Sequence, residues 1–250
     1  MRHLLSPEGA RALAELLARA PLIAFDFDGT LAPIVERPDD AHVPEAMAEA
    51  LRALAARHPL AVISGRDADD LRARLGFDAH WVIGNHGAEH DDPAPVEIRA
   101  AQAALDGWRG TLVAEHSALD ELGVVVEDKR LSVALHYRGA RDVERARVHL
   151  ARLVSHLPPE LAAFGGKFVV NVVARALPDK GATLRALVRK TGAGAAFFAG
   201  DDVNDESVFE QAEPHWLTVR IGRDVSDSRA MYGLDSHEEL LAVLHAMLDH

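Results

Sequence analysis

The feature that most constrains this chain is an alternation of short apolar runs with helical patterns near both ends but not in the middle. The runs Leu22–Phe25, Leu60–Ile63 and Trp81–Ile83 each end at a polar or glycine residue, and segments of helical periodicity separate them. The run Ala195–Ala199 and a strand near 216–221 repeat the pattern towards the C-terminus. Strands that alternate with helices predict a doubly wound, mostly parallel α/β sheet.

The middle of the chain has a different organisation. After a polar, proline-containing break at 91–95, it predicts helices near 100–118 and 141–155 and strands near 124–126, 131–137 and 167–173. The alternation within 131–137 is typical of a half-buried antiparallel strand. We therefore expect a discontinuous core, residues 1–89 and 178–250, interrupted by an α+β cap domain, residues 90–177.

Composition excludes several classes of protein. The 250 residues include no cysteine, which excludes disulfides and a thiol nucleophile and fits a reducing compartment. The net charge of −12 argues against a general nucleic-acid partner, which needs a basic face. No apolar run reaches the roughly 20 residues that cross a bilayer, and the N-terminus lacks a secretory signal. We expect a cytoplasmic protein with neither a membrane nor a nucleic-acid partner.

The segment Asp26-Phe27-Asp28-Gly29-Thr30 follows the first buried run and carries two carboxylates two residues apart. A period of two places both on one side if the extended backbone continues. Ligands of open α/β sheets bind at the carboxyl ends of strands, and close carboxylates are costly unless a cation or proton separates them. A solvated acidic turn is the alternative, but the preceding strand and the following Gly-Thr favour a site.

A second acidic cluster, Gly200 to Glu206, also follows a predicted strand. Its carboxylates repel one another, which favours a site for a hard cation. Asp201 is the best candidate ligand because it lies closest to the strand end. Helix N-capping is the alternative role for Asp205 and Glu206.

Two further segments suit a phosphate ligand. Ser64-Gly65-Arg66 ends the second buried run and combines a hydroxyl, backbone amides and a guanidinium. Lys180 opens a predicted helix, where the helix dipole disfavours a lysine, so a pairing with anionic groups would explain it. A common Ser-Gly turn and a solvated lysine are the alternatives. The chain contains no phosphate-binding P-loop and no Gly-x-Ser-x-Gly elbow.

These four segments, in this order, resemble the haloacid dehalogenase superfamily of phosphotransferases, and the insertion matches the position of its type-2 cap. The superfamily's four motifs match Asp26–Thr30, Ser64, Lys180 and Gly200–Asp205. Further segments resemble the trehalose-6-phosphate phosphatase family over almost the whole chain: Ile63–Arg66, Gly84–Glu89, Glu127–Lys129, Ser132–Arg138 and Gly200–Glu206. The resemblance implies hydrolysis of trehalose 6-phosphate.

The resemblance also implies roles for individual residues. Asp26 is the expected nucleophile and Asp28 the general acid and base, with Ser64 and Lys180 holding the phosphoryl oxygens. Mg²⁺ is the expected cofactor, bound by Asp26, by the backbone carbonyl of Asp28 and by Asp201. Substrate contacts are expected from Gly65, Arg66, Asn85, His86, Glu127, Lys129, His136, Arg138 and Asn171.

One departure from the family pattern concerns the sugar. Asn171 stands where the family usually has a glutamate that binds the disaccharide; an asparagine keeps an acceptor but loses the charge. This keeps sucrose 6-phosphate and a glycosyl-phosphoglycerate open as alternative substrates. A non-catalytic sugar-phosphate sensor, or a phosphatase-like partner of a synthase, is an alternative of another class. We expect a monomer, functionally coupled to a trehalose-6-phosphate synthase.

Overall fold

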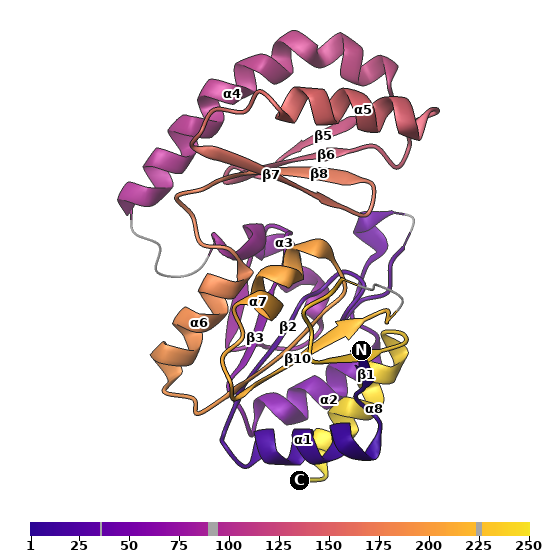
Figure 1. Ribbon diagram of the computed structural model, residues 1–250, viewed down its shortest axis with the longest axis vertical. Coiled ribbons are helices and arrows are strands. Elements are labelled where there is room, and N and C mark those ends of the chain that lie inside the picture. The colour runs from indigo at the N-terminus through magenta and orange to yellow at the C-terminus, as the bar shows by residue number, and fades with distance from the viewer. Residues whose placement is uncertain (36, 90–94, 224–226) are drawn as a thin grey trace. The chain divides into compact units, whose positions relative to one another are not determined.

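A computed structural model describes residues 1–35, 37–89, 95–223 and 227–250 of the chain (Figure 1). The chain divides into two compact units, one of Met1–His90 with Asp179–His250 and one of Asp91–Pro178. We call these the core and the cap. Most of the polar break expected at 91–95, and with it the first boundary of the insertion, lies outside the described residues.

Within the described residues, seven strands of the core form one sheet in the order β1-β11-β10-β9-β2-β3-β4. Every neighbouring pair is parallel. These strands are β1 (Arg2–His3), β2 (Leu22–Phe25), β3 (Leu60–Ile63), β4 (Trp81–Ile83), β9 (Ala196–Gly200), β10 (Trp216–Ile221) and β11 (Tyr232–Leu234). The predicted α/β fold with a mostly parallel sheet is confirmed.

Helices cover both faces of the core sheet, which explains why β2 and β3 are continuous apolar runs. Ile23 and Phe25 of β2 face one hydrophobic cluster, and Leu22 and Ala24 face another. The first cluster includes side chains of α1 (Pro7–Leu17), α2 (Glu45–Ala55), α3 (Ala68–Leu75) and α8 (Glu238–Leu248). The second includes side chains of α6 (Lys180–Thr191) and α7 (Glu206–Glu210). Both sets of side chains pack in layers against the sheet.

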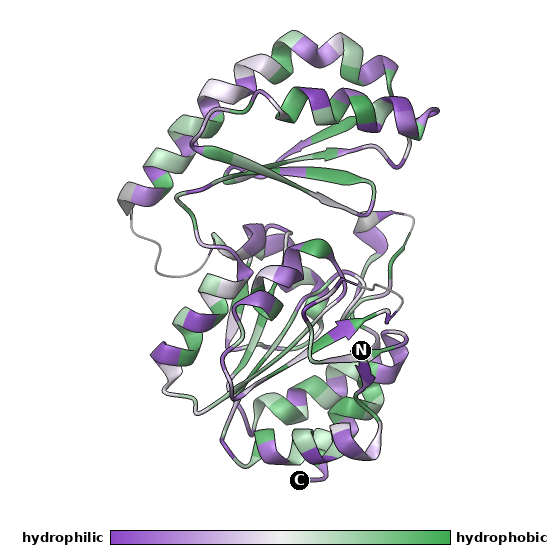
Figure 2. Cartoon of the chain, in the orientation of Figure 1, coloured by the Kyte–Doolittle hydropathy of each residue, from purple (hydrophilic) through white to green (hydrophobic). Residues whose placement is uncertain are grey.

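The cap has its own antiparallel sheet and its own hydrophobic cluster. Its strands, in the order β5-β6-β8-β7, are β5 (Val125–Asp128), β6 (Ser132–His136), β8 (Val169–Ala174) and β7 (Leu161–Gly166). The helices α4 (Pro95–Glu121) and α5 (Val143–Val154) supply Trp108, Leu150 and others to that cluster. Figure 2 shows hydrophobic residues along the strands of this sheet and alternating colours along the helices.

The structure differs from the expected elements in three places. The sequence predicts a single strand near 167–173, but the chain forms a hairpin of β7 and β8, turning at Lys167 and Phe168. The segment of β7, Leu161–Gly166, consists largely of alanine and glycine, which have low strand propensity. The short strands β1 and β11 were not predicted because two or three residues carry no periodicity.

In the part of the chain that is described, no helix is both long and apolar enough to span a membrane.

Candidate active site

Two aspartates lie at the topological switch point of the core sheet, where the order of its strands reverses. Asp26 directly follows β2 and Asp201 directly follows β9, and these strands are neighbours. From β2 the chain continues through β3 to β4, and it then returns to place β9 on the other side of β2. The carboxyl ends of strands at such a switch point form the ligand crevice of an open α/β sheet. Both aspartates are buried.

A buried lysine joins Asp26 to a third aspartate. Lys180 begins α6, whose N-cap is Asp179, and its side chain is only 1% exposed. Its Nζ donates to Asp26 Oδ1 at 2.6 Å and to Asp205 Oδ1 at 2.7 Å. Burial lowers the pKa of Lys180, but the charges of Asp205 and Asp26 outweigh burial and hold this pKa above its ordinary value. Lys180 is therefore an ammonium ion between two carboxylates.

The charges of this cluster fit a divalent cation. One oxygen of each of Asp26, Asp201 and Asp205 lies within 4.8 Å of the others. Burial raises the pKa of Asp26 well above its ordinary value; the charge of Lys180 opposes this effect, and the charges of Asp205 and Asp201 add to it. When all three carboxyl groups are ionised, they and one ammonium leave two negative charges, and carboxylate oxygens are ligands that Mg²⁺ prefers. The donor set therefore fits Mg²⁺.

Asp205 takes part in two interactions, of which the sequence indicated one. Its Oδ2 accepts from the Asp202 backbone N–H at 3.0 Å, which completes a capping box. Its Oδ1 accepts from Lys180. The structure thus shows a capping role for Asp205 but not for Glu206, whose oxygens accept from Arg220 and Arg229. No signal in the sequence pairs Asp205 with a lysine on another helix.

Asp28 pairs with an arginine that was expected to contact phosphate. Arg66 Nε donates to Asp28 Oδ2 and Arg66 Nη2 donates to Asp28 Oδ1, both at 2.8 Å. This bidentate arrangement fixes the plane of the carboxylate as well as its position. Arg66 Nη1 also donates to Asp70 Oδ2 at 3.0 Å. The structure therefore places Arg66 on two carboxylates.

The ends of β3 and β4 bring four further candidate residues together. Ser64 is buried, and its Oγ accepts from the Arg66 backbone N–H at 3.2 Å. A Cβ atom on Gly65 would lie 2.3 Å from Cε1 of the His86 ring, so glycine allows this close approach. Asn85 and His86 have left-handed φ values of 49° and 60°, which are rare for residues other than glycine.

Two residues outside the predicted site, Glu89 and Asn204, contact this loop. Glu89 Oε2 accepts from Asn85 Nδ2 at 2.9 Å and from the Ala68 backbone N–H at 3.0 Å, which ties the loop to the start of α3. Asn204 Nδ2 lies 3.3 Å from His86 Nδ1. This contact joins the loop after β4 to the loop after β9.

The candidate residues of the cap lie on one face of its sheet. Glu127 of β5 pairs with Ala134 of β6, which pairs with Asn171 of β8. Asn171 in turn pairs with Phe164 of β7. Register partners point to the same face of a sheet. Val133, Leu135 and Val172, which alternate with Ala134 and Asn171 along β6 and β8, belong to the hydrophobic cluster shared with α4 and α5. The row from Glu127 to Phe164 is therefore on the face away from the helices.

Glu127 is the centre of a small polar group on this face. His136 Nε2 lies 2.8 Å and Lys129 Nζ 3.4 Å from Glu127 Oε2. The hydrogen bond to His136 and the charge of Lys129 hold the pKa of Glu127 below its ordinary value, although burial opposes them. Arg138 is exposed and lies two residues beyond the end of β6. The structure thus brings three of the five predicted cap residues into contact.

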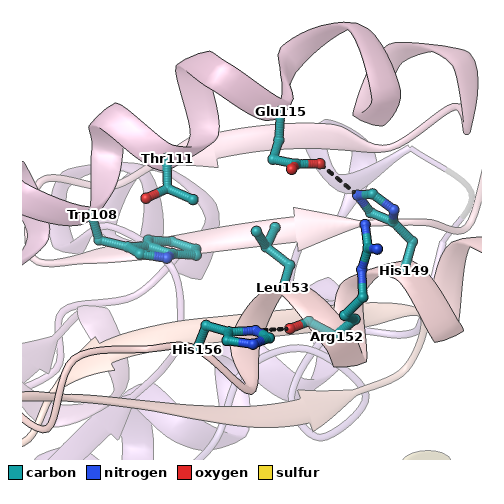
Figure 3. A pocket seen from close by; sticks show the side chains of 7 residues that line it. All are labelled: Trp108, Thr111, Glu115, His149, Arg152, Leu153 and His156. Carbon is teal, nitrogen blue, oxygen red and sulfur yellow. Dashed lines mark hydrogen bonds and ion pairs between the residues drawn. The ribbon is translucent and has the colours of Figure 1, made fainter.

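The helical layer of the cap contains a hollow of about 440 Å³ (Figure 3). Its lining consists of Trp108, Thr111, Glu115, His149, Arg152, Leu153 and His156. Glu115 Oε2 and His149 Nε2 are 3.1 Å apart. Because α4 and α5 cover one face of the sheet and Glu127 and Asn171 lie on the other, the hollow contains none of the candidate sugar-binding residues.

A second group of possible metal ligands lies at the edge of the core sheet: His3, Asp235 and Glu239. Arg223 holds both oxygens of Asp235, at 2.6 and 3.0 Å. The Leu5 backbone N–H donates to His3 Nδ1, and the Asp235 N–H donates to Glu239 Oε2. Hydrogen bonds and ion pairs within the protein account for this group, so we assign it no metal.

Solved structures define the class of protein to which this architecture belongs. The C-terminal domain of a Candida albicans trehalose-6-phosphate phosphatase superposes with a TM-score of 0.81, at 19% identity and 96% coverage of both chains. A haloacid dehalogenase-like hydrolase from Bacillus subtilis superposes with a TM-score of 0.59, at 19% identity, over 92% of this chain and 99% of that one. The chain therefore has the haloacid dehalogenase fold with an inserted cap.

Sequence comparison identifies the family. The sequence model of the trehalose-phosphatase family matches residues 24–234, and the chain belongs to this family. The trehalose-phosphate phosphatase of Mycobacterium tuberculosis is 36% identical over 244 residues, which cover 92% of this chain and 62% of that protein. An uncharacterized glycosyl hydrolase of the same species is 40% identical over 78% of this chain but only 15% of its own length. The chain thus spans less than two thirds of these relatives.

Proposed function

We propose that this chain hydrolyses trehalose 6-phosphate to trehalose and inorganic phosphate. Membership of the trehalose-phosphatase family supports this substrate. The observation that carries the proposal is the buried group of Asp26, Lys180, Asp201 and Asp205 at the switch point of the core sheet. Phosphoryl transfer through an aspartyl phosphate requires a carboxylate nucleophile, a positively charged group and a divalent-cation site close together, and this group of residues provides all three.

In the first step an oxygen of Asp26 forms a bond to phosphorus as the bond to the sugar oxygen breaks, and Asp28 gives a proton to that oxygen. In the second step the oxygen of a water molecule forms a bond to phosphorus as the bond to the Asp26 oxygen breaks, and Asp28 takes a proton from the water; inorganic phosphate and the free Asp26 carboxylate result. Lys180 holds Asp26 in place through Oδ1 and, with Ser64, binds the phosphoryl oxygens. Both steps thus use Asp28, first as an acid and then as a base.

We infer that Mg²⁺ is the cofactor, held by Asp26, Asp201 and the backbone carbonyl of Asp28. When bound, it offsets the repulsion between the attacking carboxylate and the phosphate dianion. Asp205 supports the site through Lys180, whose Nζ donates to its Oδ1, while its Oδ2 accepts from the Asp202 N–H.

We assign recognition of the sugar to the cap, through Glu127, Lys129, His136, Arg138 and Asn171. The face that carries Glu127 and Asn171 is the face that α4 and α5 leave uncovered, which supports this assignment. In the core, Gly65, Arg66, Asn85 and His86 are the proposed contacts of the phosphate end. We further propose that the enzyme is cytoplasmic and is functionally coupled to a trehalose-6-phosphate synthase. We also propose that it is a monomer, which a measurement of its molar mass by light scattering tests.

A second candidate is a phosphatase of another sugar phosphate, and Asn171 is the observation that favours it. This residue is buried in β8 in the same row as Glu127, and it lacks the charge that the family usually places there.

Release of inorganic phosphate from a panel of substrates tests the proposal. The panel comprises trehalose 6-phosphate, sucrose 6-phosphate, a glycosyl-phosphoglycerate and p-nitrophenyl phosphate, with Asp26→Asn as the inactive control. We expect the highest kcat/KM for trehalose 6-phosphate and no turnover by the variant. A higher kcat/KM for another sugar phosphate would identify that compound as the substrate in place of trehalose 6-phosphate. Activity of Asp26→Asn would show that Asp26 is not the nucleophile.

A further inference from the structure

Arg66 connects the pair with Asp28 to a carboxylate on the first turn of α3. Besides its two bonds to Asp28, its guanidinium donates through Nη1 to Asp70 Oδ2 at 3.0 Å. The side chain of Arg66 is 12% exposed and lies over the ring of Phe27, with Cζ 5.3 Å from the ring centroid. The guanidinium is thus held on one face by an aromatic ring and at its edges by two carboxylates.

Asp70 is itself fixed. Asp67 caps α3, accepting from the backbone N–H groups of Asp69 and Asp70. Arg74, one turn further along α3, donates from Nη2 to Asp70 Oδ1 at 2.5 Å and from Nε to both oxygens at 2.9 Å. Arg74 also donates to the carbonyl oxygen of Asp39. Asp70 therefore holds Arg66 from a rigid element.

An ion pair between neighbouring turns of a helix is common and of little consequence when exposed. The adjacent residue provides an example: Asp69 pairs with Arg72 at 2.8 Å, and the Asp69 side chain is 92% exposed. Asp70 differs because it also bonds the poorly exposed Arg66, which contacts a proposed acid–base residue. Arg66 thus links the Asp28 carboxylate to a carboxylate on α3.

The clamp on Asp28 is compatible with proton transfer. Each carboxylate oxygen has two acceptor sites, so two bonds from Arg66 leave one site on each oxygen. Proton transfer needs a short distance and a suitable direction, and an error of about 1 Å costs on the order of a hundredfold in rate. Fixing the plane of the Asp28 carboxylate therefore affects the chemical step more than substrate binding.

We propose that Asp70 is a positioning residue of this enzyme: it orients the Arg66 guanidinium, which in turn sets the Asp28 carboxylate for proton transfer. The inference rests on the proposed phosphatase function. Its consequence depends on the leaving group. A sugar oxygen needs a proton as it leaves, whereas the oxygen of an aryl phosphate leaves readily without one. A loosened Asp28 therefore impairs the release of sugar much more than the release of an aryl alcohol.

The test compares Asp70→Asn with Asp69→Asn, a matched change on the same turn of α3. For trehalose 6-phosphate we expect Asp70→Asn to lower kcat and kcat/KM about tenfold to a hundredfold, with KM little changed. For p-nitrophenyl phosphate kcat/KM should fall less than about threefold, since it reports only the steps up to departure of the leaving group. Asp70→Glu should restore most of the loss, and Asp69→Asn should behave as wild type.

Equal losses on both substrates, or no loss on the sugar phosphate, would overturn the proposal. A second readout does not need activity: the Arg66 Nε–H signal in nitrogen-15 NMR spectra, assigned by its disappearance in Arg66→Lys. We expect slow exchange of this proton with water in wild type and Asp69→Asn, and fast exchange in Asp70→Asn. If wild type releases no phosphate from any sugar phosphate, the proposed function fails, whereas unchanged exchange in Asp70→Asn contradicts the positioning role alone.

Discussion

Lys180 begins a helix, where the helix dipole disfavours a positive charge, and it is almost completely buried. Both costs are offset by Asp26 and Asp205, which accept from its Nζ. The two aspartates in turn depend on the lysine, because otherwise their charges would be buried without compensation. At the scale of single residues, the site is therefore a set of groups that stabilise one another.

Replacement of Lys180 by methionine should reveal this dependence. Leaving two buried carboxylates without a cation should lower the free energy of unfolding by about 3 kcal/mol, measured by urea denaturation in the presence of a chelator. Adding Asp205→Asn should recover part of the loss because one of those charges disappears. Lys190→Met, an exposed position on the same helix, is the control, and an equal loss there would contradict the explanation.

The pH dependence of stability should report on Asp70. Its hydrogen bonds to Arg74, and then to Arg66, outweigh partial burial and hold its pKa below the ordinary value of 3.8. A lowered folded-state pKa contributes stability above the unfolded pKa, and this contribution is lost as pH falls through the folded value. Below about pH 4 the difference in unfolding free energy between wild type and Asp70→Asn should therefore shrink. A difference independent of pH would contradict this.

The sequence locates these residues better than it identifies their partners. Asp26, Ser64 and Asp201 were placed at strand ends by the apolar runs before them, because a parallel sheet brings the carboxyl ends of its strands together. The pairing of Arg66 with Asp28 joins residues 38 apart in the chain. Nothing in the local sequence determines which of several nearby carboxylates a guanidinium contacts, so this pairing required the structure.

At the scale of elements, the turn after β2 depends on a glycine. Gly29 has a φ of +82°, and a Cβ there would lie 2.2 Å from Asp201 Oδ2. Glycine therefore permits both the left-handed backbone and the close approach of the loop after β9. The two loops of the proposed metal site can meet only because this position has no side chain.

Gly29→Ala should therefore lower activity as well as stability. We expect a loss of at least about 1–2 kcal/mol from backbone strain and about a hundredfold in kcat/KM from displacement of Asp201. Gly192→Ala is the matched control: its φ is +68°, but nothing lies within 4 Å of the new Cβ. It should lose similar stability and keep its turnover. Equal turnover by the two variants would show that the contact with Asp201 is unimportant.

The cap sheet separates its two faces by the period of two along each strand, and this separation predicts a selective effect. Lys129→Ala removes a neighbour of Glu127. It should lower kcat/KM for trehalose 6-phosphate about tenfold or more, because a charged contact with the sugar phosphate is lost. The value of kcat/KM for p-nitrophenyl phosphate should fall much less. Arg147→Ala on α5, which pairs with Glu144, is the control. Equal effects on both substrates would refute sugar recognition by Lys129.

Elements were predictable where periodicity was strong. The buried strand at 216–221 and the helix from 180 have the expected positions. A continuous apolar run or a helical spacing extends over many residues of one segment and can therefore be recognised in the sequence. The strand β7 lacked such a signal: its alanines and glycines are held by pairing with β8, a tertiary contact. Its propensity alone does not favour a strand.

At the scale of the whole molecule, the net charge of −12 is distributed unevenly. Most acidic side chains are exposed or paired on the surface, but Asp26, Asp201 and Asp205 are buried together. Clustered negative charge inside a protein costs free energy unless a cation compensates it. The core unit therefore carries an electrostatic cost that Lys180 reduces but does not cancel.

Binding of Mg²⁺ should accordingly stabilise the folded chain and be required for turnover. A ligand that binds only the folded state, at a hundred times its Kd, adds about 2.7 kcal/mol to the free energy of unfolding. We expect a shift of this size on adding Mg²⁺ to protein dialysed against EDTA, together with recovery of phosphate release. Asp201→Asn should abolish both effects, whereas Asp235→Asn, in the other group of possible ligands, should retain them. Full activity after EDTA treatment, or an unchanged shift in Asp201→Asn, would exclude the proposed site.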